Sequence, residues 1–131
     1  LTHQIICSLL YWLDLKEAND LALRLARAYT NSTNTIVVEG AYHGHTLSVL
    51  EVSPYKYEHS KEFHLTTQQC GEKTPGRHIW EVPIPDSYRG RHRGNDAGEK
   101  YAEYVKAACD YYTSNGETVG AFIIEGGMSV G

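Results

Sequence analysis

The segment from Thr35 to Pro54, TIVVEGAYHGHTLSVLEVSP, determines the expected fold class. It opens with an apolar, β-branched run, Ile36–Val38, which is typical of a buried strand. A helical spacing of apolar residues follows and ends before Pro54, because the residue before a proline disfavours helix. The pattern therefore predicts a strand-to-helix loop that carries Tyr42 and His43 between two glycines.

Tyr42 and His43 are candidate ligand-binding residues because ligands of open α/β sheets bind beside the carboxyl ends of the strands. An aromatic ring and an imidazole at that position suit a planar, polar ligand. A second candidate is Glu125, which directly follows the apolar run Val119–Ile124. In the alternative interpretation Tyr42 and His43 are ordinary turn residues, and Glu125 only caps the next loop.

Two amphipathic helices are predicted on either side of this segment. Each begins with capping-box spacing, Asp14 with Glu17 and Asp96 with Glu99. The expected apolar stripes are Ala18, Leu21, Ala22, Leu25 and Tyr29 in the first helix, and Tyr101, Tyr104, Val105, Ala108 and Tyr112 in the second.

Further strands are predicted at Ile79–Val82 and at Val119–Ile124, the latter fully buried. Phe63–Thr67 is a candidate short strand, and Gln68–Gly76 is expected to form a mobile surface loop. Strands that alternate with helices indicate βαβ units. The expected fold class is therefore α/β, with a mostly parallel sheet and flanking helices.

Composition and charge restrict the class of protein. The 131 residues suffice for one domain with a modest core. The net charge of -4 gives no electrostatic basis for binding nucleic acid. The apolar run Ile5–Leu13 is too short to cross a bilayer, so no membrane association is expected. Three scattered cysteines form no disulfide framework, which favours a reducing compartment, and Cys109 is expected to be a small buried hydrophobe.

Two further groups of residues have a functional and a plain interpretation. Arg89 and Arg91 belong to a short basic cluster, which suits a solvated loop or a site for a phosphate-bearing small molecule. His43 and His45 form a His-x-His pair. No further ligand at a recognisable spacing completes it, so we expect no metal.

Five segments, in order along the chain, resemble one family. They are Glu17–Arg27, Ala41–His45, Ser53–Lys56, Pro85–Gly90 and Ala121–Glu125. Together they are similar to the class III (fold type I) pyridoxal-phosphate enzymes, usually called class III aminotransferases. Within that family they resemble the alanine-glyoxylate aminotransferase 2-like group, which includes phospho-lyases acting on ethanolamine phosphate and 5-phosphohydroxylysine. The resemblance implies a partial large, cofactor-binding domain over residues 17–131, preceded by a divergent segment, 1–16.

The resemblance also implies roles for single residues. Tyr42 would stack on the ring of pyridoxal 5'-phosphate, His43 would lie at the cofactor's edge, and Glu125 would set the polar environment near ring and substrate. Arg89 and Arg91 are candidates for binding the substrate. The implied reaction is transamination or phosphate elimination on a small amine or phosphoamine, in a homodimer of mitochondrial or cytoplasmic location.

The chain departs from the family pattern before Glu17. The family has Ser-Gly-Ser at that point, which supplies donors to the cofactor phosphate at a helix start. This chain has Asp14, Leu15 and Lys16, and the carboxylate of Asp14 would repel a phosphate. The family's essential aspartate and cofactor-binding lysine are expected beyond Gly131, so we expect a fragment that does not catalyse the reaction alone.

Two alternative functions stay open at this point. The chain can be a non-catalytic remnant of the family that binds no cofactor, or a metal-dependent hydrolase built around His43 and His45. A fragment would in addition expose an unpaired sheet edge and apolar helix faces, so we expect self-association.

Overall fold

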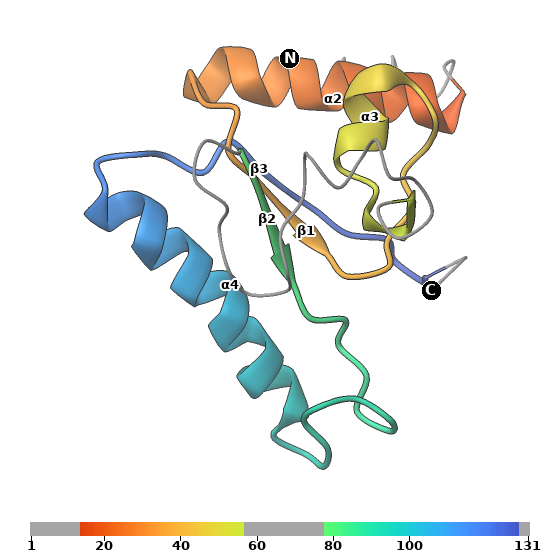
Figure 1. The fold of residues 1–131 in the computed structure, drawn as a ribbon, viewed down its shortest axis with the longest axis vertical. Helices are drawn as coiled ribbons and strands as arrows, with labels where there is room; N and C mark the ends of the chain where they lie inside the picture. Colours follow the sequence, from red (N-terminus) through yellow and green to blue (C-terminus); the bar gives the residue numbers. More distant parts are fainter. Residues whose placement is uncertain (1–13, 57–77, 129–131) are drawn as a thin grey trace, which may run out of the picture.

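The computed structural model describes residues 14–56 and 78–128, which form helices around a small sheet (Figure 1). The elements in chain order are α2 (Leu15–Thr30), β1 (Thr35–Val38), α3 (Leu47–Glu51), the 3₁₀ turn η1 (Pro54–Lys56), β2 (Ile79–Val82), α4 (Ala97–Ser114) and β3 (Ala121–Ile123). The strand and loop predicted at Phe63–Thr67 and Gln68–Gly76 lie outside the described residues, as does the apolar run Ile5–Leu13.

The three described strands form one parallel sheet in the order β2-β1-β3. Thr35 of the central strand pairs with Ile79 of β2 and with Ala121 of β3. All three strands therefore end at the same edge of the sheet. The predicted parallel sheet with flanking helices is confirmed.

The central strand β1 is buried on both faces, which explains its continuous apolar sequence. On one face, Ile36 and Val38 pack with Ala108 and Tyr112 of α4. On the other, Val37 packs with Leu23 of α2 and with residues of α3 and the turn that follows it. The result is a three-layer arrangement, with α2 and α3 on one side of the sheet and α4 on the other (Figure 1).

Helix α2 begins and ends close to the predicted positions, but its apolar stripe is only partly buried. Ala18 is buried, and so is Leu23, which the predicted stripe omitted. Leu25 and Tyr29, which the stripe included, are 42% and 93% exposed. The described strands and α3 cover only part of this helix, so the rest of the stripe is left at the surface.

Helix α4 has the predicted stripe, with Tyr101, Ala108 and Tyr112 buried. The predicted capping box is wrong, because the Asp96 side chain makes no cap hydrogen bond. That carboxylate instead pairs with the ammonium group of Lys100 at 2.7 Å, one turn further along the helix. Cys109 was expected to be buried, but it is only half-buried; it packs against the cluster between α4 and the sheet.

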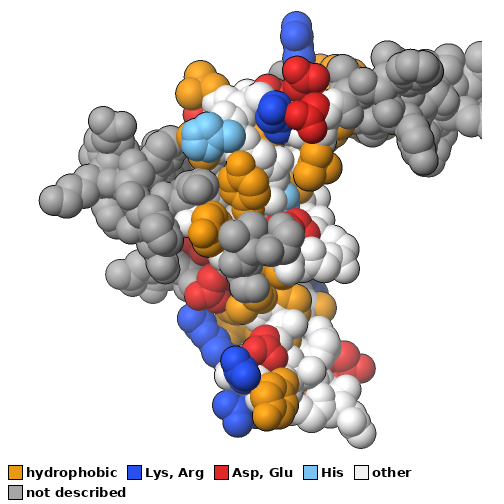
Figure 2. Space-filling view, turned by 90° about the vertical axis from the view of Figure 1, so that its right-hand side faces the viewer, with side chains coloured by type: hydrophobic (Ala, Val, Ile, Leu, Met, Phe, Trp, Pro, Cys, Tyr) orange, Lys and Arg blue, Asp and Glu red, His pale blue; other side chains and the backbone are white. Residues whose placement is uncertain are grey.

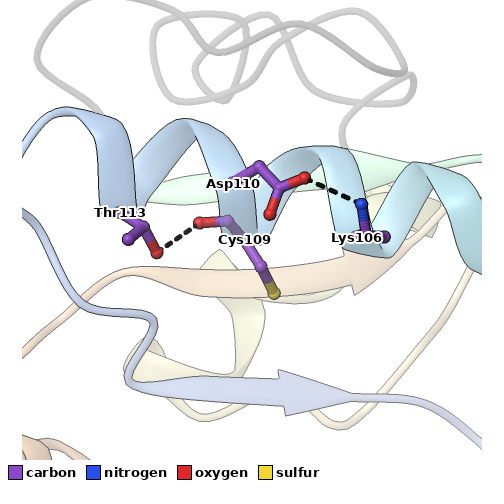
Figure 3. A network of polar contacts seen from close by, with 4 residues as sticks. All are labelled: Lys106, Cys109, Asp110 and Thr113. Carbon is purple, nitrogen blue, oxygen red and sulfur yellow. Dashed lines mark hydrogen bonds and ion pairs between the residues drawn. The ribbon is translucent and has the colours of Figure 1, made fainter.

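Figure 3 shows the two faces of α4 at this point. The sulfur of Cys109 points toward the sheet, whereas Lys106 and Asp110 form an ion pair of 3.3 Å on the outer surface.

Among the described helices none is both long enough and apolar enough to cross a membrane.

Strand β3 differs from its prediction. It was expected to be fully buried over Val119–Ile124, but it spans only Ala121–Ile123 and lies at one end of the described sheet. Phe122 and the following Ile124 are 46% and 47% exposed. The apolar sequence correctly indicated a parallel strand, but it does not say whether a further strand or helix covers the outer side.

Candidate functional site

Tyr42 and Glu125 meet at the carboxyl edge of the sheet. Tyr42 lies on the loop between β1 and α3, and Glu125 lies two residues after β3. The backbone N–H of Tyr42 donates a hydrogen bond of 2.8 Å to Oε1 of Glu125. The prediction that these two residues occupy the same edge is therefore confirmed, and the contact itself joins a side chain to the backbone of the loop.

The Tyr42 ring lies at the surface of the fold and belongs to neither buried cluster. The side chain is half-buried, and its ring meets the ring of Tyr55 edge to face, with centroids 6.2 Å apart. The two ring planes are inclined at 72°, a favourable arrangement for aromatic pairs. Tyr42 is thus held at the rim of the sheet, not inside the core.

His43 is the most buried of the candidate residues, with only 3% of its surface exposed. Its backbone is fixed on both sides: the N–H donates to Oγ of Ser53 at 3.0 Å, and the carbonyl accepts from Nδ2 of Asn19 at 2.9 Å. Its ring atom Nε2 is buried and has no hydrogen-bond partner in the described part of the chain. Burial lowers the pKa of this imidazole and the nearby charge of Glu125 partly opposes the shift, so the ring is neutral near pH 7.

Gly44 brings the loop against the first turn of α2. Its φ is +133°, and a β-carbon added there would lie 2.6 Å from Cβ of Lys16. Only glycine allows this backbone shape together with this close approach. The start of α2 consequently lies beside the Tyr42–His43 loop.

The start of α2 carries its own acid. Oδ1 of Asp14 accepts a hydrogen bond of 2.8 Å from the backbone N–H of Leu15, and Oδ2 lies 2.9 Å from the ammonium group of Lys16. These contacts lower the pKa of Asp14, the bond with Lys16 being the larger cause. The helix start therefore already holds a carboxylate, paired with Lys16, at the place where a bound phosphate would need free N–H donors.

Arg89 and Arg91 are exposed on the loop after β2. This loop is ordered by Asp86, whose Oδ1 accepts from the backbone N–H of both Tyr88 and Arg89 at 2.8 and 2.9 Å. Figure 2 shows Lys and Arg side chains gathered toward the lower end of the molecule, where this loop and the start of α4 lie. No contact described in the structure joins the two arginines to Tyr42, His43 or Glu125.

No metal centre is visible in residues 14–56 and 78–128, which contain no group of three or more His, Cys, Asp or Glu side chains able to share an ion. His43 is buried, whereas His45 is exposed. The His-x-His pair is therefore split between the interior and the solvent.

Asn19 and Ser53, which fix the His43 backbone, were not predicted as site residues. Both lie inside segments that carry the family resemblance, Glu17–Arg27 and Ser53–Lys56. Their position inside these segments was the only signal that could have identified them as site residues. Their residue types gave no such signal, because asparagine in a helix and serine before a proline are common at ordinary surfaces and caps.

The segments that carry the resemblance can be compared with known protein families. The model of the class III aminotransferases matches residues 16–131. The chain belongs to the class III aminotransferase family. Enzymes of this family generally use pyridoxal phosphate.

Two curated relatives show which members of the family this chain is similar to. A Drosophila melanogaster protein named alanine–glyoxylate aminotransferase 2-like is 40% identical over 120 residues, covering 88% of this chain and 22% of its own length. A Caenorhabditis elegans protein named ethanolamine-phosphate phospho-lyase homolog 1 is 38% identical over 128 residues, covering 88% of this chain and 25% of its own length. The chain thus spans about a quarter of the length of the curated relatives it matches.

A solved structure has the same fold. It is a phospholyase from Arthrobacter in complex with phosphoethanolamine, with a TM-score of 0.55 and 28% identity, covering 91% of this chain and 28% of that one. The predicted fold, an α/β part of a class III aminotransferase, is confirmed by this match and by the family model.

Proposed function

We propose that residues 17–131 form part of the cofactor-binding large domain of a pyridoxal-phosphate-dependent enzyme, and that residues 1–16 are a divergent segment before it. The observation that carries this proposal is the hydrogen bond between Tyr42 and Glu125, which holds an aromatic residue at the carboxyl edge of a parallel sheet. Ligands of open α/β folds bind at this edge.

The residues at this rim fit the ring of the cofactor. Tyr42 contributes an aromatic ring at the rim, and the buried Nε2 of His43 is a polar atom without a hydrogen-bond partner in the described residues. In this proposal Tyr42 orients the cofactor ring by stacking, neutral His43 contacts its polar edge, and Glu125 fixes the Tyr42 backbone. When bound, pyridoxal phosphate acts as an electron sink for the bonds at the amine-bearing carbon of the substrate.

The start of α2 does not fit a phosphate group equally well. Asp14 already accepts the N–H of Leu15, and its charge repels another anion. We therefore assign no phosphate contact to this helix. This observation favours a second candidate function, a non-catalytic member of the family that binds no cofactor.

For the substrate we propose a small amine or phosphoamine. The support is the pair of relatives, one named an aminotransferase-like protein and one a phospho-lyase homologue. The exposed guanidinium groups of Arg89 and Arg91 can bind a substrate phosphate bidentately. A homodimeric assembly, a mitochondrial or cytoplasmic location and the inactivity of the isolated chain are parts of the same proposal.

A titration with pyridoxamine 5'-phosphate tests cofactor binding. This analogue has an amine in place of the aldehyde, so it cannot react with surface lysines, and its fluorescence reports binding. We expect saturable binding that is weakened roughly 5- to 150-fold in Tyr42→Ala, because stacking of a planar ring on an aromatic side chain contributes roughly 1–3 kcal/mol. The matched control is Tyr29→Ala, which removes a tyrosine that is 93% exposed on α2.

The result separates the two candidate functions. Saturable binding that depends on Tyr42 but not on Tyr29 supports the cofactor-binding domain. Absence of binding to the folded chain supports the cofactor-free alternative, which predicts binding to appear when Asp14 is replaced by serine.

A further inference from the structure

A cavity between α2 and α3 lies apart from the rim residues. Its volume is about 430 Å³, and the described residues that line it are Asp20, Leu21, Arg24, Arg27 and Ser48. Asp20, Arg24 and Arg27 share one face of α2, since they are four and three residues apart, and Ser48 comes from α3. The size is that of a small-molecule site, and among these described lining residues two arginines stand against one aspartate, so the charge that they contribute is positive.

Arg27 is the unusual residue in this cavity. Its Nε and Nη2 atoms are buried, yet neither has a hydrogen-bond partner in the described structure. In the described part of the chain, no ion pair joins Asp20 to Arg24 or Arg27 either. A guanidinium always carries its charge, and a buried charge without a partner is costly. The missing partner has to be an acceptor, and the strongest acceptor for a guanidinium is an oxyanion.

We propose that the cavity between α2 and α3 binds a small free oxyanion, a carboxylate or a phosphate. Arg27 binds the anion after a side-chain rotation that turns Nε and Nη2, which are buried in the structure, toward the cavity. These two atoms are suitably spaced for a bidentate contact with two oxygens. Arg24 adds a second positive charge at the same face, and the hydroxyl of Ser48 supplies a neutral donor from α3. The site is distinct from the proposed cofactor site, because Tyr42, His43 and Glu125 do not line it.

Titration of the 131-residue chain with inorganic phosphate, and separately with acetate, tests the proposal. The readout is the Nε–Hε signal of arginine in nitrogen-15 NMR spectra, together with the melting temperature. We expect saturable binding of at least one anion, a shift of the Arg27 signal, and a higher melting temperature. Arg27→Gln should weaken binding roughly tenfold or more, because a hydrogen bond to a charged group is lost.

Two control variants locate the binding. Lys106→Gln removes one exposed positive charge from the outer surface of α4, across the sheet from the cavity, and should leave binding unchanged. Tyr42→Ala should also leave it unchanged, so that loss of the cofactor site and loss of this site are distinguishable. Equal binding to the wild type and Arg27→Gln, or no saturation with either anion, would overturn the proposal.

Melting temperatures measured in buffer without phosphate or acetate test whether Arg27 has only a structural role. If Nε and Nη2 of Arg27 lack a partner until an anion binds, Arg27→Gln removes two unpaired buried donors and should melt at the same or a higher temperature than the wild type. A variant that unfolds in anion-free buffer would show that Arg27 already serves the fold, and the proposal would be wrong. Concentration-dependent dimerisation that shifts the Arg27 signal would likewise refute it, because the acceptor would then be a carboxylate of a second copy.

Discussion

Glu125 acts on the candidate site through the backbone of Tyr42. Its carboxylate accepts the Tyr42 N–H at 2.8 Å and connects the end of β3 to the β1–α3 loop. This hydrogen bond requires an acceptor oxygen, which an amide can supply as well as a carboxylate. Charge and position can therefore be separated by substitution.

Replacing Glu125 by glutamine should preserve the loop, because the amide oxygen can still accept the Tyr42 N–H. Replacing it by alanine leaves that half-buried donor unpaired, at a cost of about 1–3 kcal/mol in the free energy of unfolding. Urea denaturation of both variants measures the difference. Equal losses in the two variants would indicate that the charge, and not the hydrogen bond, is what matters.

The titration of His43 gives a second prediction at the level of a single residue. Burial lowers its pKa in the folded chain below the ordinary value of about 6.5, so the unfolded state binds the proton more readily. The stabilising contribution is then fully present above about pH 6.5 and is lost as the pH falls through the folded pKa.

Unfolding measured between pH 7.5 and pH 5 should therefore show a loss of stability that is smaller in His43→Asn than in the wild type. The NMR signal of the His43 ring should titrate with a pKa below the ordinary histidine value of about 6.5. A pKa of His43 above that value would mean that the charge of Glu125 outweighs burial.

The contact between the β1–α3 loop and helix α2 depends on Gly44. Gly44→Ala should destabilise the chain by about 1–3 kcal/mol, because the new Cβ would lie 2.6 Å from Cβ of Lys16 at a φ of +133°. Gly98→Ala is the matched control: nothing lies within 4 Å of the added carbon, and alanine favours the helix. Thermal melts of the two variants should move in opposite directions, and a neutral Gly44→Ala would show that the loop can separate from α2.

The secondary-structure elements were largely predictable, and the errors have identifiable causes. The pattern of apolar residues in the sequence correctly predicted the positions of β1, β2 and α4. Each of these elements packs against partners that the described chain itself contains. The exposed half of α2 and the exposed side of β3 were mispredicted, since periodicity reports which side is apolar but not what covers it. The capping box at Asp96 failed because Lys100 competes for the same carboxylate.

The candidate site was predictable only in part. Parallel strands end together, so Tyr42 and Glu125 were expected at one edge, and the structure places them there. The side chains that fix His43, from Asn19 and Ser53, act on its backbone. Contacts of that kind leave no spacing pattern, which is why residue-type reasoning missed them.

The molecule as a whole presents an apolar strand at one end of its described sheet. Phe122 and Ile124 are 46% and 47% exposed on or beside β3. An exposed apolar edge strand is a template for pairing with a second chain. We therefore expect sedimentation velocity to show association that increases with concentration.

Phe122→Lys should reduce this association, because an edge lysine disfavours strand pairing. The control is Tyr88→Lys, which places the same charge at an aromatic position 78% exposed on the loop after β2. A wild-type chain that stays monomeric at tens of micromolar would contradict the prediction, since non-obligate pairing of such edges occurs at micromolar to millimolar concentrations.

Among the described strands, the central strand β1 leaves the ribosome first. Both neighbours of β1 in the described sheet come later in the chain, β2 at Ile79 and β3 at Ala121. The N–H and C=O groups of β1 therefore lack these strand partners until β2 and β3 have been synthesised. Nascent chains with delayed long-range pairing fold slowly and expose adhesive surface in the meantime. Production of this polypeptide should consequently depend on chaperone supply and on translation speed across the codons between β1 and β3.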